Sequence, residues 1–293
     1  MSSPDIQRRF IIGDRYVYYK IYTGHLMQNR LLQNEIFHLV ADLYATGRIT
    51  GFFFIRYTDH DGSHLRLRFL AADPSALPFI IVRLHDILKE YVNARMVFKV
   101  MLDTYTREIE RYGSSNILDV EKLFFYNSLE VIHLLREHAE NSTVLWLSAL
   151  QLINTFYDQL GYGWEEKHRV SRLFLDWAEK KISPGPASKE EIKKRYRENS
   201  PQIHQWITSP GTKTAPPLSK DIPCQEECLQ HIVARYPPNS VEKDLILASL
   251  LHMMFNRLFS ANQNTIEMVC YAMMEKYCRS RSAISKQSQK ITA

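Results

Sequence analysis

The sequence lacks the patterns of secreted and membrane-spanning proteins. Its first residues contain no apolar signal-peptide core, and no uninterrupted apolar run is long enough to cross a bilayer. We therefore expect a cytoplasmic protein without a membrane span. The four cysteines form no CxxC pair, so we expect free thiols and not a zinc site or a redox motif.

Motifs of several enzyme classes are also missing. The absence of HExxH, of a glycine-rich phosphate loop and of GxSxG argues against a zincin, a nucleotide-cradling fold and an α/β-hydrolase. The net charge of +5 is mild, and no run of lysine and arginine is dense enough to indicate a nucleic-acid site. We expect no metal, no cofactor and no direct nucleic-acid binding.

The N-terminal half alternates strand and helix patterns. Aromatic, β-branched or alternating residues predict strands at 15–22, 51–57, 64–71 and 96–105. Helical spacing predicts a helix at 29–45, and Asp73 or Ser75 can cap a second helix that ends near residue 91. This order is that of a ferredoxin-like βαββαβ unit with an antiparallel-rich sheet and helices on one face.

The second half has helical patterns almost throughout. Helices are predicted at 118–140, 142–160, 165–181, 188–199, 227–236, 240–259 and 264–279. A Pro/Gly/Ser/Thr-rich loop is predicted at 208–223, and a disordered tail at 281–293. We therefore expect an α+β fold in one domain, 10–280, whose sheet-containing half, 10–113, packs against a largely helical half, 114–280.

One predicted strand carries an unusual charge pattern. Strict alternation at 63–69 places His64, Arg66 and Arg68 on one face and apolar residues on the other. Three potentially cationic side chains in a row repel one another unless a negative group lies over them. The pattern predicts an anion-binding face. The alternative is a solvated sheet face whose arginines pair with nearby carboxylates.

Two further segments are candidates for chemistry. After the fourth predicted strand, a helical turn would place Glu108 beside Arg111 and Arg107 near Arg111, so that a carboxylate fixes a guanidinium for a substrate carboxylate. The alternative is an exposed salt-bridged turn. On a later helix, His252 and Asn256 lie four residues apart beside an apolar stripe, where a histidine could transfer protons or serve structure alone.

Four blocks together resemble the C-terminal elimination domain of lantibiotic dehydratases, also called the thiopeptide-type bacteriocin biosynthesis domain. The blocks are 18–22 (YYKIY), 53–59 (FFIRYTD) running on to 64–69 (HLRLRF), 107–113 (REIERYG) and 252–257 (HMMFNR). Each block alone is a weak signal, but all four in this order are specific. Ser114 departs from the pattern, because a second glycine commonly follows Gly113.

The resemblance implies a reaction. In this family a serine or threonine of a precursor peptide is first esterified with glutamate from glutamyl-tRNA. The elimination domain then removes the Cα proton and expels glutamate, which leaves dehydroalanine or dehydrobutyrine. Since the glutamylation domain is absent, the resemblance implies the stand-alone half of a split dehydratase. Its partners would be the glutamylated precursor peptide and a separate glutamylation protein; a homodimer is left open.

The resemblance also implies roles for individual residues. Arg66, Arg68 and Arg111 would bind the glutamyl group or the enolate, and His252 would act as acid or base. Glu108 would orient Arg111. Further substrate contacts would come from His64, Arg56, Arg107 and Asn256.

Two other functions stay open. A pyridine synthase has the same fold, but joins two dehydroalanines by formal cycloaddition and expels the leader peptide. Such enzymes tend to lose part of the arginine and histidine set that this chain retains. A non-catalytic subunit that presents the precursor peptide is the third hypothesis, although peptide binding alone would not need this polar set.

Overall fold

The structure is a computed structural model that describes residues 6–138, 141–209 and 225–292, with side chains to residue 287. The chain divides into two compact units. The first comprises Met1–Ala139, Thr214–Pro237 and Asn256–Ala261, and the second comprises Glu140–Lys213, Pro238–Phe255 and Asn262–Ala293. The fold class is α+β, as the sequence predicts. The chain passes between the two units more than once, and one passage lies inside helix α10 (Val241–Leu258), between Phe255 and Asn256.

The first unit contains the predicted sheet. Its strands are β1 (Arg9–Phe10), β2 (Tyr16–Tyr22), β3 (Ile49–Asp59), β4 (Gly62–Ala71), β5 (Lys99–Leu102) and β6 (Tyr105–Thr106). Four of them form an antiparallel sheet in the order β3-β4-β2-β5, and β1 pairs with β6. In chain order, the strands of the four-stranded sheet come as one strand, a helical segment, two strands, a second helix and a last strand.

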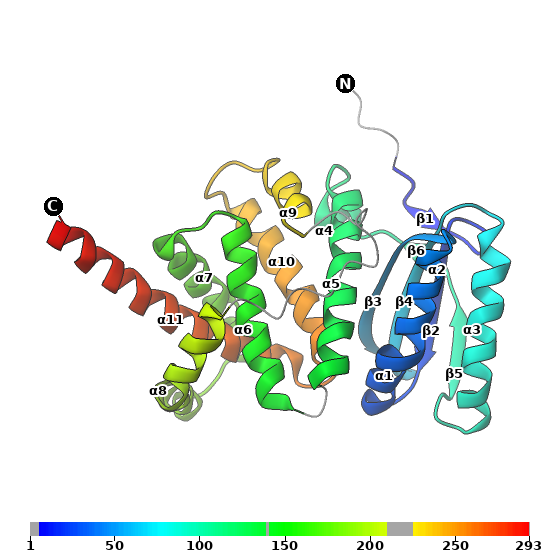
Figure 1. Ribbon diagram of the computed structural model, residues 1–293, viewed down its shortest axis with the longest axis horizontal. Coiled ribbons are helices and arrows are strands. Elements are labelled where there is room, and N and C mark those ends of the chain that lie inside the picture. The colour runs from blue at the N-terminus through cyan, green and yellow to red at the C-terminus, as the bar shows by residue number, and fades with distance from the viewer. Residues whose placement is uncertain (1–5, 139–140, 210–224, 293) are drawn as a thin grey trace. The chain divides into compact units, whose positions relative to one another are not determined.

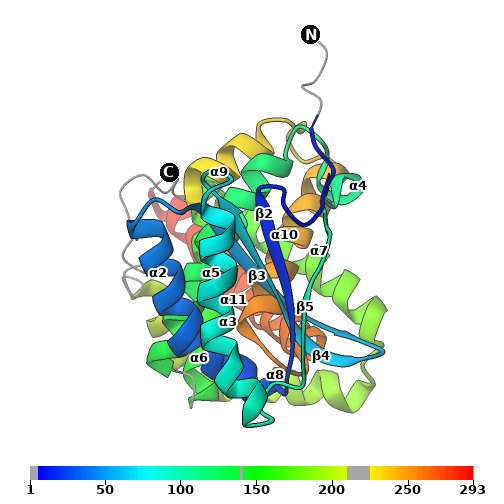
Figure 2. The same cartoon turned by 90° about the vertical axis from the view of Figure 1, so that its right-hand side faces the viewer.

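Helices cover one face of this sheet. The helices of the first unit are α1 (His25–Leu31), the π-helical η1 (Leu32–Ile36), α2 (Phe37–Ala45), α3 (Ala76–Asn93), α4 (Ile109–Tyr112), α5 (Ile117–His138) and α9 (Gln225–Val233). Figure 2 shows α2 and α3 in front of the sheet. Helix α5 lies beside β3 (Figure 1). The Ser128 hydroxyl of α5 accepts a hydrogen bond from the Phe54 backbone N–H of β3 at 3.2 Å.

The two faces of β4 have opposite character because side chains alternate along a strand. Leu65, Leu67 and Phe69 are fully buried on the helix-covered face. His64, Arg66 and Arg68 lie on the other face, as predicted. Their cross-strand neighbours on this face are Tyr22, Lys20 and Tyr18 of β2 and Tyr57, Ile55 and Phe53 of β3.

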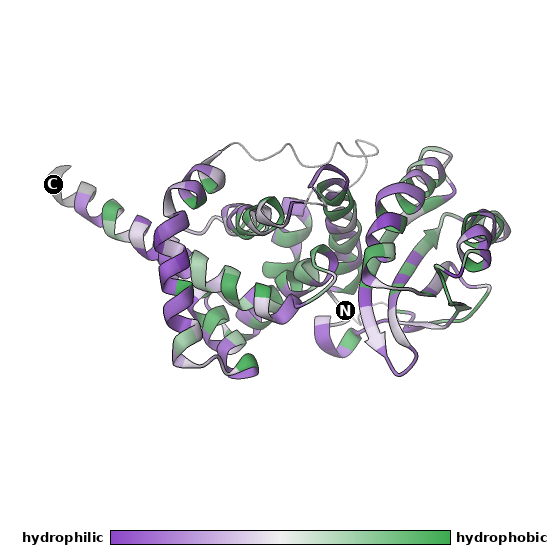
Figure 3. Ribbon diagram, turned by 90° about the horizontal axis from the view of Figure 1, so that it is seen from below, coloured by the Kyte–Doolittle hydropathy of each residue, from purple (hydrophilic) through white to green (hydrophobic). Residues whose placement is uncertain are grey.

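The second unit is helical. It contains α6 (Ser142–Gln159), α7 (Trp164–Ile182), α8 (Pro186–Thr208), α10 (Val241–Leu258) as far as Phe255, and α11 (Gln263–Thr292). Aromatic contacts join α7 to α11, with ring centroids of Phe174 and Tyr271 5.6 Å apart. The hydropathy colouring in Figure 3 shows how strongly hydrophilic α8 is. None of the described helices has the length and apolar character that a bilayer crossing needs.

Two helices are longer than their patterns predict. Helix α8 continues through Pro201 to Thr208, and most of the loop predicted at 208–223 lies outside the described residues. Helix α11 continues through 281–292, where the sequence predicts disorder. No glycine or proline interrupts this stretch, and Lys286 forms an ion pair with Glu165 of α7 at 2.7 Å. Local periodicity was therefore a poor guide to its end.

Glu130 on α5 makes folding stability depend on pH. It is 7% exposed, and burial raises the pKa of its carboxyl from 4.5 to about 8. Between these values the folded protein holds a proton that the unfolded chain releases. The stabilising contribution of this group is therefore complete below pH 4.5 and is lost as the pH rises through 8.

We expect Glu130→Gln to remove this dependence. The difference in melting temperature, wild type minus variant, should become more negative as the pH rises from about 5 to about 8. Only the wild type has a carboxyl group here that is protonated when folded and releases its proton on unfolding. Thermal unfolding of both proteins across this range measures the difference. Parallel pH profiles would show that Glu130 does not carry the effect.

Candidate functional site

The Arg66 guanidinium is held in a fixed orientation on β4. Its Nε donates a hydrogen bond to His64 Nε2 at 3.1 Å, and its guanidinium carbon lies 3.6 Å from the ring centroid of Tyr57. His64 Nδ1 in turn lies 3.1 Å from the Gly62 carbonyl oxygen. Nδ1 therefore carries the proton, since Nε2 accepts from Arg66.

His64 thus accepts from Arg66 as a neutral imidazole. Burial lowers the pKa of its imidazole, and the Arg66 charge acts in the same direction. The sequence pattern suggested three cations on this strand face, but only Arg66 and Arg68 are charged. No residue in the described ranges hydrogen-bonds the two terminal nitrogens of Arg66, so they remain available to a planar anion such as a carboxylate.

The Arg68 guanidinium is buried among aromatic rings. It is 6% exposed, and neither Nε nor Nη1 has a hydrogen-bond partner among the described residues. Three aromatic rings surround the guanidinium, with centroids 4.7 Å (Tyr18), 4.9 Å (Tyr105) and 5.1 Å (Phe53) away. Ring faces attract a cation, but they accept no strong hydrogen bond from its N–H groups. A buried donor left in this state is a candidate for ligand binding.

The charge of Arg68 acts on two more buried polar residues, Tyr112 and Arg257. The Tyr112 hydroxyl is buried and has no hydrogen-bond partner in the described part of the chain. Burial raises its pKa to about 12, although the charges of Arg68 and Arg257 act the other way. Arg257 is fully buried, 4.2 Å from the Phe124 ring centroid. Burial lowers its pKa to about 9, and the charge of Arg68 adds to this effect.

We call Arg68, Tyr112 and Arg257 the Arg68 cluster. The charge of Arg68 disfavours the charge of Arg257 in this buried region, and a buried donor without a partner, as at Arg68 Nε and Nη1 and at the Tyr112 hydroxyl among the described residues, costs about 1–3 kcal/mol. An anion would relieve both penalties. Sequence analysis missed Tyr112 and Arg257, although each directly follows a candidate residue, Arg111 and Asn256.

Helix α4 contains the predicted carboxylate–guanidinium pair. Glu108 Oε2 lies 3.4 Å from Arg111 Nη1, and both side chains are exposed. The Arg111 guanidinium carbon lies 5.3 Å from the ring centroid of Tyr112. Arg111 thus lies beside one member of the Arg68 cluster, at the solvent-accessible end of α4.

Arg107 does not join Arg111. It is buried and donates two hydrogen bonds to Glu121 of α5, Nε to Oε1 at 2.8 Å and Nη2 to Oε2 at 2.6 Å. The hydroxyls of Tyr16 and Tyr105 donate to the same carboxylate at 2.8 and 2.7 Å. Arg107 is therefore part of a buried network that joins α5 to β2 and β6.

We expect Arg107→Ala to destabilise the protein by about 3–5 kcal/mol, because it leaves the Glu121 carboxylate buried without its ion-pair partner. Urea unfolding measures this loss. Arg66→Ala is the matched control, since Arg66 forms no ion pair with a described residue, and should change stability far less. Similar unfolding midpoints for the two variants would contradict a structural role for Arg107.

Arg56 and Asn256 are joined at the outer edge of β3, the edge strand of the sheet. The Arg56 guanidinium donates to the Arg257 carbonyl at 2.9 Å, to Gln28 Oε1 at 3.2 Å and to Asn29 Oδ1 at 2.8 Å. The Asn256 side chain bonds both the backbone N–H and the carbonyl of Arg56, each at 2.9 Å. These bonds fix the end of α10 and with it Arg257. Neither side chain is brought to the face of Arg66 and Arg68.

In the second unit, His252 pairs with a buried carboxylate. His252 Nδ1 lies 2.8 Å from Glu267 Oε2, and the other oxygen of Glu267 accepts the Tyr271 hydroxyl at 3.0 Å. Glu267 is 8% exposed. No described residue bonds His252 Nε2, so this pair presents an imidazole nitrogen that can take up or give a proton.

No sequence pattern marks Glu267, because it lies on a different helix, α11, fifteen residues after His252. His252 and the arginines belong to different units. Their convergence on one site stays a prediction.

Comparison with known proteins identifies what this chain is similar to. The family model described as "Lantibiotic biosynthesis dehydratase C-term" matches residues 17–278. Subtilin biosynthesis protein SpaB of Bacillus subtilis is 23% identical over 269 residues, which cover 87% of this chain and 25% of SpaB. The chain thus spans about a quarter of the length of this curated relative.

Solved structures share the fold. The tRNA-dependent lantibiotic dehydratase MibB from Microbispora sp. 107891 aligns with a TM-score of 0.66 at 19% identity, over 93% of this chain and 29% of that chain. TsrL aligns with a TM-score of 0.63 at 13% identity, over 91% and 95% of the two chains. The pyridine synthase TbtD from thiomuracin biosynthesis gives 0.62 at 12% identity, over 89% and 97%.

Proposed function

This chain belongs to the lantibiotic biosynthesis dehydratase C-terminal family, and we propose that it eliminates glutamate from glutamylated serine or threonine in a ribosomally made precursor peptide. A base removes the Cα proton, the Cβ–O bond breaks and glutamate leaves as its carboxylate. The electron pair of the Cα–H bond becomes the Cα=Cβ double bond of dehydroalanine or dehydrobutyrine.

The buried Arg68 guanidinium, whose Nε and Nη1 have no partner among the described residues, is the observation that carries this proposal. Substrate and leaving group bring carboxylates, and proton removal places negative charge on the peptide carbonyl oxygen. Preorganised donors stabilise such charge most strongly where water is excluded. Arg68 and Tyr112 provide buried donors without partners among the described residues, Arg66 provides an oriented guanidinium, and Arg111 would receive the exposed end of the substrate.

The proton transfer is assigned to His252. Glu267 accepts the hydrogen bond from Nδ1 and so holds the imidazole with Nε2 directed away from the carboxylate. In this state Nε2 can accept the Cα proton and later pass it to the departing carboxylate or to water. Because the substrate must arrive glutamylated, a separate glutamyl-tRNA-dependent protein is the proposed partner.

A synthetic peptide that carries one glutamyl ester on serine tests the proposal. Incubation with purified protein should release one glutamate per site and leave a dehydroalanine, which mass spectrometry detects as the loss of the whole glutamate. An unchanged glutamylated peptide would reject glutamate elimination. Spontaneous release in buffer alone sets the baseline.

Pyridine synthesis is the second candidate, because the fold match to TbtD extends over 97% of that chain. A peptide with two preinstalled dehydroalanines distinguishes the two functions. Cycloaddition would consume this peptide and expel its leader segment, whereas an elimination enzyme would leave it unchanged. The retained Arg66, Arg68, Arg111 and His252 set favours elimination.

A further inference from the structure

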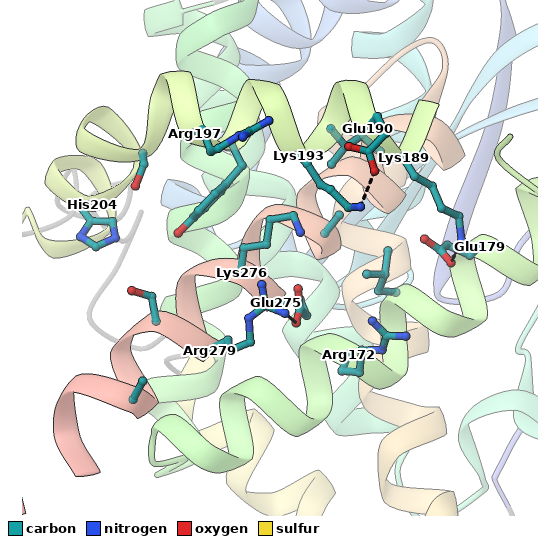
Figure 4. Close-up of a pocket in the computed structure, with 17 residues that line it drawn as sticks. Arg172, Glu179, Lys189, Glu190, Lys193, Arg197, His204, Glu275, Lys276 and Arg279 are labelled. Carbon is teal, nitrogen blue, oxygen red and sulfur yellow. Dashed lines mark hydrogen bonds and ion pairs between the residues drawn. The ribbon is translucent and has the colours of Figure 1, made fainter. Parts of the chain in front are cut away.

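A charged groove lies within the second unit, between α7, α8 and α11. Its volume is about 860 Å³, within the size range of ligand sites. Six cationic side chains and three carboxylates line it. The cationic residues are Arg172, Lys189, Lys193, Arg197, Lys276 and Arg279. Figure 4 shows that they come from all three helices, with Lys193 and Lys276 directed into the same space.

Several of these cations already have partners. Lys189 pairs with Glu179 at 2.6 Å, and Arg279 with Glu275 at 3.4 Å. Lys193 pairs with Glu190 within one turn of α8. Arg172 pairs with Asp176 on its own helix. These pairs account for all three carboxylates of the groove.

Two cations remain. Across the described ranges, neither Arg197 nor Lys276 has an ion pair or a side-chain hydrogen bond. Lys276 is half-buried, and burial lowers its pKa; the charges of Arg279, Lys193 and Arg172 lower it further, against the effect of Glu275. A bound anion would relieve this crowding of like charge.

The rest of the lining determines which kind of anion fits. Leu175, Ile192 and Tyr196 add apolar surface between the charged groups. A nucleic-acid backbone carries a negative charge on every nucleotide and offers few apolar groups to this surface. A peptide could place carboxylates at Arg197 and Lys276 and apolar side chains on the surface between them.

We propose that this groove binds a peptide segment in which carboxylates alternate with apolar side chains. Along α8 its lining runs from Lys189 to His204, about 22 Å at 1.5 Å per residue. About seven residues of extended peptide would span that length. The site lies wholly in the second unit, and binding there requires no elimination chemistry.

Fluorescence anisotropy tests this binding with the full chain and a fluorescein-labelled peptide of about ten residues, long enough to span the groove, in which Glu alternates with Leu. The variant Arg197→Gln, Lys276→Gln should weaken binding at least about tenfold, since two charge-assisted contacts are lost. The matched control Lys180→Gln, Lys194→Gln removes the same charge from α7 and α8 outside the groove lining, and should change the affinity less than about twofold.

Three outcomes would overturn the proposal. A matched peptide with Gln in place of every Glu could bind as tightly, in which case carboxylates are not recognised. A labelled single-stranded RNA of equal length could bind more tightly and lose affinity in the groove variant. Sedimentation could instead show a dimer that the groove variant dissociates, with no peptide bound. Because binding is measured without turnover, failure here leaves the proposed elimination untouched, and failure of elimination leaves this result standing.

Discussion

Replacing Arg68 by methionine should abolish most elimination activity and leave the protein at least as stable as the wild type. Methionine fills similar space between Tyr18, Tyr105 and Phe53 but carries no charge. Losing a preorganised donor to developing negative charge costs about 10²–10³-fold in rate. The fold loses no hydrogen bond at Nε or Nη1, because neither has a partner among the described residues. It sheds the cost of a buried, unpartnered cation.

Arg68→Lys separates shape from charge. A guanidinium grips a carboxylate through two parallel hydrogen bonds, whereas an ammonium is a point charge on a flexible stem. We therefore expect lysine to be almost as inactive as methionine. Arg83→Ala is the matched control: Arg83 is an exposed arginine of α3 that pairs with Asp42 at 3.6 Å.

Glutamate release from the synthetic peptide and thermal unfolding should be measured on the same preparations. If Arg68→Met lowers the melting temperature by several degrees, Arg68 stabilises the fold. If Arg68→Lys retains most of the wild-type turnover, a diffuse positive charge at this position is enough for elimination. The first outcome would contradict the expected stability of the methionine variant, and the second would remove an orienting role of Arg68 toward the substrate.

The sheet could be predicted because its signals are local. Alternation along 63–69 fixes which side chains share a face, and the observed register places Arg66 and Arg68 together as expected. The ends of helices and of compact units are set by contacts between distant segments of the chain, so local patterns did not predict them. The division inside α10 and the continuation of α11 depend on packing between residues far apart in the chain.

The site was predictable in part for the same reason. The Glu108–Arg111 pair is three residues apart and formed as expected. Arg107 and Arg56 have equally prominent positions in their motifs, but each binds partners that are distant in the chain. Arg107 pairs with Glu121. Arg56 donates hydrogen bonds to Gln28, Asn29 and the Arg257 carbonyl. Neither spacing nor residue type distinguishes an arginine paired within the fold from one left for a substrate.

Removal of the His252 side chain should also stop elimination. Positioned proton transfer contributes about 10²–10⁴-fold, so His252→Ala should lower kcat by that factor. KM should change little, because the arginines carry substrate binding in the proposed function. His168→Ala is the matched control, since His168 forms a comparable pair with Glu275 at 3.2 Å in the same unit.

Glu267→Gln tests how the histidine is positioned. The carboxylate accepts from Nδ1 and leaves Nε2 able to take a proton. An amide can instead donate its N–H to Nδ1, which moves the imidazole proton to Nε2 and blocks it as a base. We expect kcat to fall toward the His252→Ala value with KM unchanged, and the melting temperature to separate this effect from unfolding. Wild-type turnover in His252→Ala would make the histidine structural, and full activity in Glu267→Gln alone would remove the carboxylate from the mechanism.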